Sequence, residues 1–278
     1  MNNLVLRSIS GIVYVSIIIV SLITTDWAFG SLCLLFAALG VLEFGKLCNN
    51  RVNISTLIFD VIIAIAIVGG TYTVAAKGIG YVPAVFALSV LLVLVRMVTQ
   101  LYIKNETNSL NTLAYSFTGI CYVVMPMVFM IIMYHITSPQ VLLAMFVMIW
   151  LNDSGAYIVG STLGRKIPYK LFPRISPKKS WAGFVGGLLF AVASVFVFKY
   201  CFGDYYKGMS TLVMVGFAIV VTLFSTWGDL IESMMKRALN VKDSGNLIPG
   251  HGGILDRIDS LLFVVPALFC YVIIIYSI

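Results

Sequence analysis

Nine long apolar segments constrain the fold of this chain more than any other feature. They cover residues 9–23, 27–47, 54–76, 80–99, 113–135, 139–160, 183–202, 210–235 and 258–277. Their lengths lie near the roughly 20 residues that a helix needs to cross a membrane. Only 10% of the chain is charged, against about 25% in an ordinary soluble domain. Backbone in lipid must be helical or form a closed barrel, and the alternation typical of barrel strands is missing from the sequence. The sequence therefore predicts an all-α, polytopic integral membrane protein with about nine transmembrane helices.

The segments fall into two regions that meet at residue 137. We expect residues 1–137, with about five helices, to form an N-terminal membrane scaffold or a homodimer surface. Residues 138–278, with about four helices and two cytoplasmic polar loops, are expected to form the catalytic region, because the conspicuous polar clusters lie there. The first apolar segment has only a weak cleavage site, so we expect it to remain as the first helix.

The basic residues predict the orientation of the helices. If the N-terminus is cytoplasmic, every Lys and Arg except Lys77, Lys199 and Lys207 lies in or beside a cytoplasmic loop, as the positive-inside rule requires. This distribution accounts for the net charge of +7 without nucleic acid as a partner. Most acids fall on the same side, which a cytoplasmic site would explain. The sequence thus predicts a multi-pass protein of the cell (inner) membrane, with its N-terminus and active site in the cytoplasm.

A polar stretch from Ser233 to Asp259 interrupts the apolar pattern near the C-terminus. The helical pattern of the preceding segment continues to about Leu239. Offsets of three, four and seven residues place four side chains on one stripe of that helix: Asp229, Glu232, Ser233 and Lys236. A solvated helix end with an ordinary Glu232–Lys236 pair is the alternative. Asp229 is harder to explain in this way, because an unpaired acid at the bilayer centre costs about 2.5–3.5 kcal/mol on the mildest scale.

The glycine-rich loop from Lys242 to Gly253 ends where the last helix is expected to begin. A helix start presents unpaired N–H groups and partial positive charge, which together can hold phosphate. Asp256 lies in the first turn of this helix, where it could simply complement the helix dipole. A carboxylate facing bound phosphates would repel them unless a divalent cation lay between. We therefore predict that Asp229 and Asp256 bind Mg²⁺, and a second cation is an open alternative.

A second polar cluster precedes the seventh apolar segment. It contains Asn152–Tyr157, Gly164–Lys166 and Ser176–Trp181. Its cations could serve only as topology signals. Four of its residues, however, stand directly before a helix start expected near Gly183 and make a donor set for phosphates: Ser176, Lys178, Lys179 and Ser180.

These polar positions together resemble the signature of a known family. The matching residues are Ser233, Lys236-Arg237, Lys242-Asp243, His251-Gly252-Gly253, Asp256-Arg257 and Asp259. At these spacings they are similar to the signature of the phosphatidate cytidylyltransferases, also called CDP-diacylglycerol synthases. The segments around Asn152 and Ser176 resemble upstream blocks of that family, with Ser180 in place of the common Thr and Ala182 in place of the common Glu or Gln. The resemblance is specific over about residues 150–260.

The resemblance implies transfer of a cytidylyl group from CTP to phosphatidate with Mg²⁺, which gives CDP-diacylglycerol and pyrophosphate. The ligands would be CTP, phosphatidate and membrane lipids. The implied catalytic set is Asp229, Lys236, Arg237, His251, Asp256, Arg257 and Asp259. The implied nucleotide-binding set is Ser176, Lys178, Lys179, Ser180, Lys242, Asp243, Gly252 and Gly253. In these sets Asp229 and Asp256 hold the metal, and Arg257 or Lys242 receives the lipid phosphate. The residues implied to neutralise phosphates are Lys178, Lys179, Lys236 and Arg237.

Two other functions stay open at this point. A CTP-dependent lipid-alcohol kinase would share the membrane setting but would release CDP instead of pyrophosphate. A transporter of phosphorylated solutes is the more distant alternative. It would be expected to place ionisable residues near the middle of the membrane within repeated, interrupted helices.

Overall fold

The computed structural model of the chain describes residues 3–48, 53–103, 108–166, 169–206, 209–248, 250 and 252–277. Among these residues, nine helical segments are long and apolar enough to cross a membrane. The prediction of an all-α, polytopic membrane protein is therefore confirmed.

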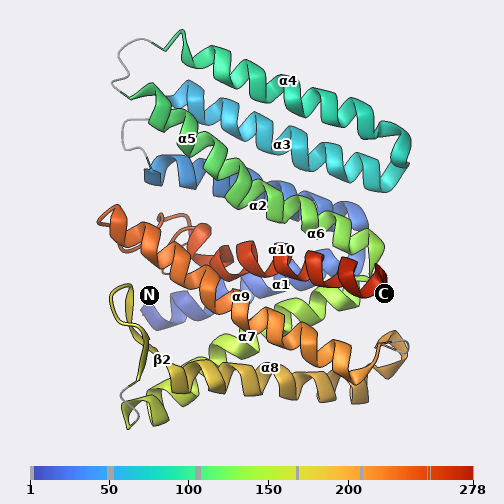
Figure 1. The fold of residues 1–278 in the computed structure, drawn as a ribbon, viewed down its shortest axis with the longest axis vertical. Helices are drawn as coiled ribbons and strands as arrows, with labels where there is room; N and C mark the ends of the chain where they lie inside the picture. The colour runs from blue at the N-terminus through green and yellow to red at the C-terminus, as the bar shows by residue number, and fades with distance from the viewer. Residues whose placement is uncertain are drawn as a thin grey trace. The chain divides into compact units, whose positions relative to one another are not determined.

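The helices follow the predicted apolar segments closely (Figure 1). They are α1 (Asn3–Thr24), α2 (Asp26–Cys48), α3 (Ile54–Lys77), α4 (Val82–Gln100), α5 (Ser109–Gly119), α6 (Met125–Ile136), α7 (Pro139–Thr162), α8 (Trp181–Cys201), α9 (Thr211–Ala238) and α10 (Leu255–Ser277). A π-helical turn, Ile120–Val124, joins α5 to α6 within one span. Short 3₁₀ turns cover Ile79–Tyr81, Leu163–Arg165 and Gly203–Tyr206.

The chain divides into two compact units, each built from two separate parts of the sequence. The first unit contains Met1–Thr137 and Val241–Ile258, and the second contains Ser138–Asn240 and Asp259–Ile278. The glycine-rich loop before α10 thus belongs with the N-terminal helices. The roles expected for residues 1–137 as a scaffold and 138–278 as the catalytic region stay predictions.

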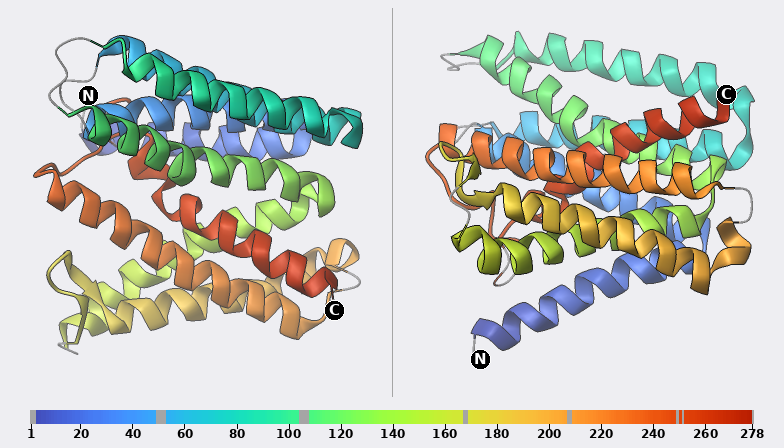
Figure 2. Two further views of the ribbon diagram at one scale, coloured as in Figure 1. Left: turned by 45° about the horizontal axis from the view of Figure 1, so that its top comes forward. Right: turned by 60° about the horizontal axis from the view of Figure 1, so that its bottom comes forward.

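In the first unit, α2 packs against α3 and α6, and α3 packs against α4. Figure 1 shows α3 and α4 side by side, and Figure 2 shows these helices from two further directions. A buried polar network ties α3, α4 and α5 together. Arg96 Nε donates to Asp60 Oδ1 at 2.9 Å and Arg96 Nη2 to Ser116 Oγ at 3.0 Å, while Ser116 Oγ donates to Asp60 Oδ2 at 2.7 Å. The Arg96 side chain is fully buried, so it serves as an internal ion-pair partner and not as a charge beside a loop.

In the second unit, α7 packs most closely against α8, and α9 packs against both. Small residues permit this approach: a Cβ added at Gly155 of α7 would lie 2.9 Å from the carbonyl oxygen of Gly186 in α8. Glycine is the residue that lets helix backbones in a membrane come this near. The close contact fixes where the start of α8 stands relative to α7.

An antiparallel hairpin leads into α8, with β1 at Lys170–Phe172 and β2 at Ser176–Ser180. Lys170 pairs with Ser180 and Phe172 with Ser176. The sequence does not predict this hairpin, because Ser-Pro-Lys-Lys-Ser lacks the alternation of apolar and polar residues that marks a strand. The hairpin presents its lysines on a defined scaffold.

Candidate active site

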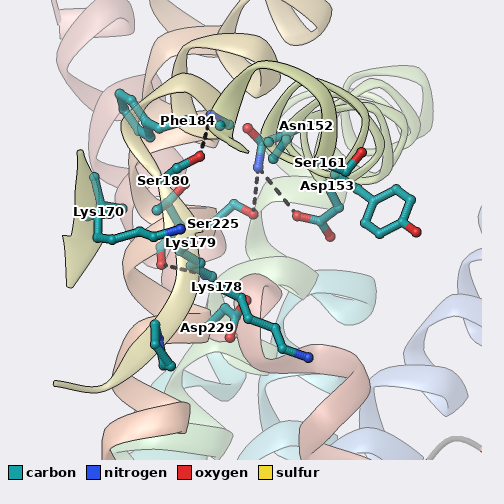
Figure 3. A pocket seen from close by; sticks show the side chains of 18 residues that line it. Asn152, Asp153, Ser161, Lys170, Lys178, Lys179, Ser180, Phe184, Ser225 and Asp229 are labelled. Carbon is teal, nitrogen blue, oxygen red and sulfur yellow. Dashed lines mark hydrogen bonds and ion pairs between the residues drawn. The ribbon is translucent and has the colours of Figure 1, made fainter. Parts of the chain in front are cut away.

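A cavity of about 850 Å³ lies in the second unit, among α7, the hairpin, the start of α8 and α9. Figure 3 shows the side chains that line it. The polar residues of its lining are Asn152, Asp153, Tyr157, Ser161, Lys170, Lys178, Lys179, Ser180, Ser225, Thr226 and Asp229. Four of these residues are predicted from the sequence to belong to the site: Lys178, Lys179, Ser180 and Asp229. The structure brings those four together around one cavity.

The hairpin supplies the positive charge of this cavity through Lys170, Lys178 and Lys179. Lys179 Nζ lies 2.6 Å from Asp229 Oδ2 and 3.5 Å from the carbonyl oxygen of Thr226. This ion pair joins β2 to α9. The cavity therefore combines three cations with two carboxylates, Asp153 and Asp229, of which Asp229 is paired with Lys179.

Ser180 ends β2 and begins α8. Its Oγ accepts a hydrogen bond from Gly183 N at 3.1 Å, which makes Ser180 the N-cap of α8. A capping hydroxyl satisfies an N–H group that the first helical turn leaves without a partner. Ser180 is buried, so its first role is to fix the helix start. Ser176, at the other end of β2, pairs with Phe172.

Asn152 lies at the junction of α7, α8 and α9. It is only 3% exposed, and its Nδ2 is 3.4 Å from both Ser225 Oγ and Asp153 Oδ1 (Figure 3). Its Oδ1 lies so close to Gly187 that a Cβ added there would clash with it. Asn152 thus holds α7 and α9 together beneath the cavity.

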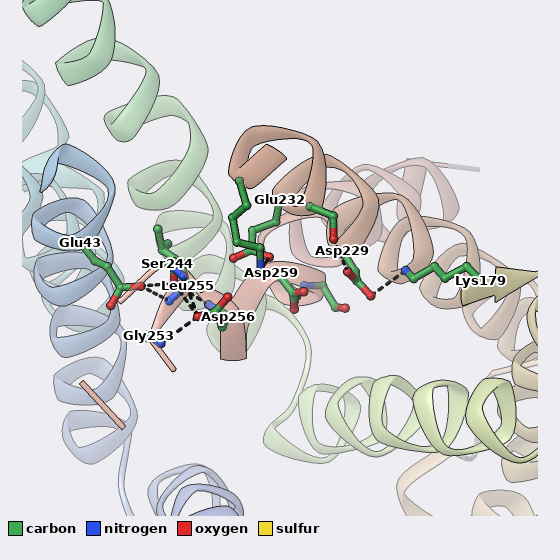
Figure 4. Close-up of polar contacts among 12 residues, drawn as sticks. Glu43, Lys179, Asp229, Glu232, Ser244, Gly253, Leu255, Asp256 and Asp259 are labelled. Carbon is green, nitrogen blue, oxygen red and sulfur yellow. Dashed lines mark hydrogen bonds and ion pairs between the residues drawn. The ribbon is translucent and has the colours of Figure 1, made fainter. Parts of the chain in front are cut away.

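The polar stripe predicted on α9 is confirmed. Ser233 Oγ donates to Asp229 Oδ1 at 3.2 Å, and Lys236 forms an i,i+4 ion pair with the buried Glu232. Both Asp229 and Glu232 act electrostatically on Asp259 of α10, which is half-buried (Figure 4). Asp229, Glu232 and Asp259 therefore form an acidic group flanked by Lys179 and Lys236.

The second predicted metal ligand, Asp256, lies in the first unit. Its Oδ2 accepts hydrogen bonds from Ser244 N at 2.9 Å, from Gly253 N at 2.8 Å and from Ser244 Oγ at 2.9 Å (Figure 4). These bonds order the loop before α10. Gly252 has a φ of 87°, a left-handed conformation that glycine adopts without strain.

Glu43, which is not among the site residues predicted from the sequence, also binds this loop. Glu43 of α2 accepts hydrogen bonds from Ile254 N at 2.9 Å, from Leu255 N at 3.0 Å and from Ser244 Oγ. The N–H groups at the start of α10 are predicted from the sequence to bind phosphate. In the structure, those of Ile254 and Leu255 donate to the Glu43 carboxylate. One signal in the sequence points to Glu43, because it is an acid inside an apolar segment, and such acids usually have a specific partner.

The remaining predicted residues are either exposed or outside the described ranges. Arg237, Lys242, Asp243 and Arg257 are exposed, and the Arg257 carbonyl oxygen accepts a hydrogen bond from Tyr14 OH at 3.1 Å. His251 lies outside the residues that the structure describes. Within the described ranges, no group of three His, Cys, Asp or Glu residues could by itself hold a metal ion.

The helices and the cavity together define a class: a polytopic membrane protein with a cationic site that also contains carboxylates. Comparison with known proteins adds the family. The chain belongs to the cytidylyltransferase family, whose model matches residues 5–275. The family resemblance carried by the signature is thereby confirmed.

Individual relatives match a shorter stretch. The chain is 45% identical over 123 residues to a phosphatidate cytidylyltransferase of Staphylococcus aureus (strain COL). The matched stretch covers 44% of this chain and 45% of that protein. It is 46% identical over 123 residues to phosphatidate cytidylyltransferases of Staphylococcus haemolyticus (strain JCSC1435) and Staphylococcus epidermidis (strain ATCC 12228 / FDA PCI 1200), again over 44% of this chain and 45% of each relative. The matched part thus spans less than half the length of these relatives.

Proposed function

We propose that this protein transfers a cytidylyl group from CTP to phosphatidate, giving CDP-diacylglycerol and pyrophosphate. The observation that carries the proposal is the cavity of the second unit, which is lined by Lys170, Lys178 and Lys179 and in which Lys179 is paired with Asp229. Its volume of about 850 Å³ falls in the range of roughly 300–1,000 Å³ that is usual for small-molecule sites. Family membership and the names of the relatives point to the same reaction.

The lysines of the hairpin would neutralise the triphosphate. Lys178 is exposed at the cavity and Lys179 already lies against a carboxylate oxygen, so both ammonium groups are near the place where an anion would bind. Placing fixed cations around a polyphosphate is the main task of an enzyme that transfers phosphoryl or nucleotidyl groups. Lys236 and Arg237, at the end of α9, are proposed to add to this charge.

The nucleophile in the proposed reaction is an oxygen of the lipid phosphate. A phosphate monoester has its second pKa near 6 and carries about −1.5 to −2 charge at pH 7, so it needs no general base. Its oxygen forms a new bond to the α-phosphorus of CTP. The bond from that phosphorus to the bridging oxygen breaks at the same time, and pyrophosphate leaves with the electron pair. His251 would act as a hydrogen-bond donor to phosphate.

Asp229 and Asp256 are proposed to bind Mg²⁺, which when bound would neutralise charge on the phosphates. Carboxylate oxygens are suitable ligands, because Mg²⁺ in nucleotide sites commonly takes one or two carboxylates together with phosphates and water. Asp229 fits this description, since its Oδ2 already accepts a cation, the Lys179 ammonium group. A second cation belongs to the same proposal.

The cavity and the N-terminus are proposed to face the cytoplasm of the cell (inner) membrane. The distribution of basic residues supports this orientation, because Lys166, Lys170 and Lys178 lie between two spans near the cavity. CTP would then reach the cavity from the cytoplasm and phosphatidate from the membrane. The N-terminal helices are proposed to form the scaffold or a homodimer surface.

A product assay tests the proposal directly. Purified protein in detergent is incubated with phosphatidate, Mg²⁺ and each of the four nucleoside triphosphates in turn. We expect CDP-diacylglycerol and pyrophosphate with CTP. Release of CDP from CTP when a lipid alcohol replaces phosphatidate would indicate a kinase instead, and nucleotide that stays unchanged in every mixture would contradict an enzymatic function.

A further inference from the structure

We infer that Glu43 is a positioning residue that holds Ser244, Ile254 and Leu255 in place and, through Ser244, orients the carboxylate of Asp256. The inference rests on the proposed function, in which Asp256 and its loop take part. Glu43 lies in α2, 201 residues before Ser244 in the sequence, and is 7% exposed.

Both oxygens of the Glu43 carboxylate are used by the same loop. Oε2 accepts from Ile254 N at 2.9 Å, and Oε1 accepts from Leu255 N at 3.0 Å and from Ser244 Oγ. A buried carboxylate without partners would be costly, and donors to a charged group contribute more than neutral ones. Glu43 therefore fixes the two ends of the loop relative to each other.

Ser244 connects Glu43 to Asp256. Its hydroxyl oxygen lies between the two carboxylates, at hydrogen-bonding distance from Glu43 Oε1 and 2.9 Å from Asp256 Oδ2. A hydroxyl has one proton, so it donates to one carboxylate at a time. Ser244 N adds a second bond to Asp256 Oδ2 at 2.9 Å. The orientation of the Asp256 side chain thus depends on where Glu43 holds Ser244.

The glycines of the loop fit around these two carboxylates. A Cβ added at Gly245 would lie 2.8 Å from Glu43 Oε2, and one added at Gly252 would lie 2.6 Å from Asp256 Oδ2. These glycines are predicted from the sequence to let a phosphate come close to the backbone. In the first unit it is the carboxylates of Glu43 and Asp256 that come close to it. This geometry makes Glu43 part of the framework that presents Asp256.

The first unit offers matched control variants. Asp60 is also a buried acid, and it accepts a hydrogen bond from the buried Ser116, as Glu43 does from Ser244. Glu43→Gln is therefore compared with Asp60→Asn, and Ser244→Ala with Ser116→Ala. Each pair removes the same chemical group from a buried network, but only the first member of each pair touches the loop.

The test uses the full chain in detergent. Tryptic cleavage after the exposed Lys242 reports loop order, and initial rates give kcat and the half-saturating concentrations of CTP and Mg²⁺. We expect Glu43→Gln and Ser244→Ala to speed cleavage after Lys242 and to raise the half-saturating Mg²⁺ by about tenfold or more, the usual effect of losing a residue that orients a ligand. Ser116→Ala should leave both readouts within about twofold of the unmodified protein.

The outcomes separate this inference from the proposed function. Wild-type cleavage and Mg²⁺ dependence in both Glu43→Gln and Ser244→Ala would overturn the positioning role. Equal changes in Ser116→Ala would also overturn it, because they would indicate general loss of stability, which Asp60→Asn produces by leaving Arg96 without its counter-charge. If Glu43→Gln does not fold, Ser244→Ala and Ser116→Ala decide the question. Absence of cytidylyl transfer by the unmodified protein would instead refute the proposed function, and the cleavage comparison would still test the role of Glu43 in the loop.

Discussion

Replacing Lys179 by Met should change the requirements for Mg²⁺ and CTP in opposite directions. Lys179 Nζ is 2.6 Å from Asp229 Oδ2, and the two side chains are 26% and 40% exposed. An ion pair that is solvated to this degree is worth about 0.2–1 kcal/mol. A cation that binds Asp229 must displace this pair. Loss of Lys179 should therefore lower the half-saturating Mg²⁺ by about 1.4-fold to 5-fold, since 1.36 kcal/mol corresponds to a factor of ten.

The same substitution removes a cation that is proposed to bind the triphosphate. A hydrogen bond to a charged group contributes about 1.5–3 kcal/mol, so the KM for CTP should rise by roughly 10-fold to 150-fold. A residue with a purely structural role would not produce a gain for one ligand and a loss for the other. The opposite signs therefore make this prediction specific.

The measurement is a grid of initial rates in which free Mg²⁺ and CTP are varied independently. Lys178→Met is the matched control, because Lys178 lines the same cavity from the neighbouring position of β2 while the ion pair with Asp229 is made by Lys179. It should raise the KM for CTP without lowering the half-saturating Mg²⁺. If Lys179→Met raises the Mg²⁺ requirement, or leaves it unchanged while CTP binding weakens, the ion pair does not compete with the metal.

Three further outcomes are expected. Asp60→Asn should lower the free energy of unfolding by about 3–5 kcal/mol, because it leaves the buried Arg96 guanidinium without its counter-charge. Thermal unfolding in detergent measures this change, and a loss below about 1 kcal/mol would contradict the prediction. A cysteine at Lys242 should react with an impermeant thiol reagent from the cytoplasmic side, and one at Lys77 from the opposite side; exchanged labelling would reverse the orientation. Rates varied in CTP and phosphatidate should give intersecting double-reciprocal lines, whereas parallel lines would indicate a covalent cytidylyl-enzyme.

Features that depend on neighbouring residues could be predicted from the sequence. The i,i+4 pair of Glu232 and Lys236 and the stripe that carries Asp229 follow from helical spacing, and both are present. The helix start expected near Gly183 is also found, with Ser180 as its cap. Such features need only a few residues of chain, so the local pattern contains the necessary information.

Features that depend on distant parts of the chain could not be predicted. Nothing near Glu43 in the sequence indicates that Ser244 and Ile254 will donate to it. The positive-inside rule places Arg96 among the charges beside a loop, although burial with Asp60 gives it an internal role. The positive-inside pattern records only that a residue is basic, and it carries no information about a partner 36 residues away.

The long separation between Glu43 and its partners has a consequence for the synthesis of the protein. Glu43 is made 211 residues before Ile254. At about 5–20 residues per second, α2 is synthesised roughly 10–40 s before the loop that satisfies its carboxylate. Throughout that interval the nascent chain contains an acid within an apolar helix whose hydrogen-bond donors have not yet been translated. The order of translation thus makes closure of the first unit a late step in biogenesis, and one that a chain truncated before residue 254 cannot complete.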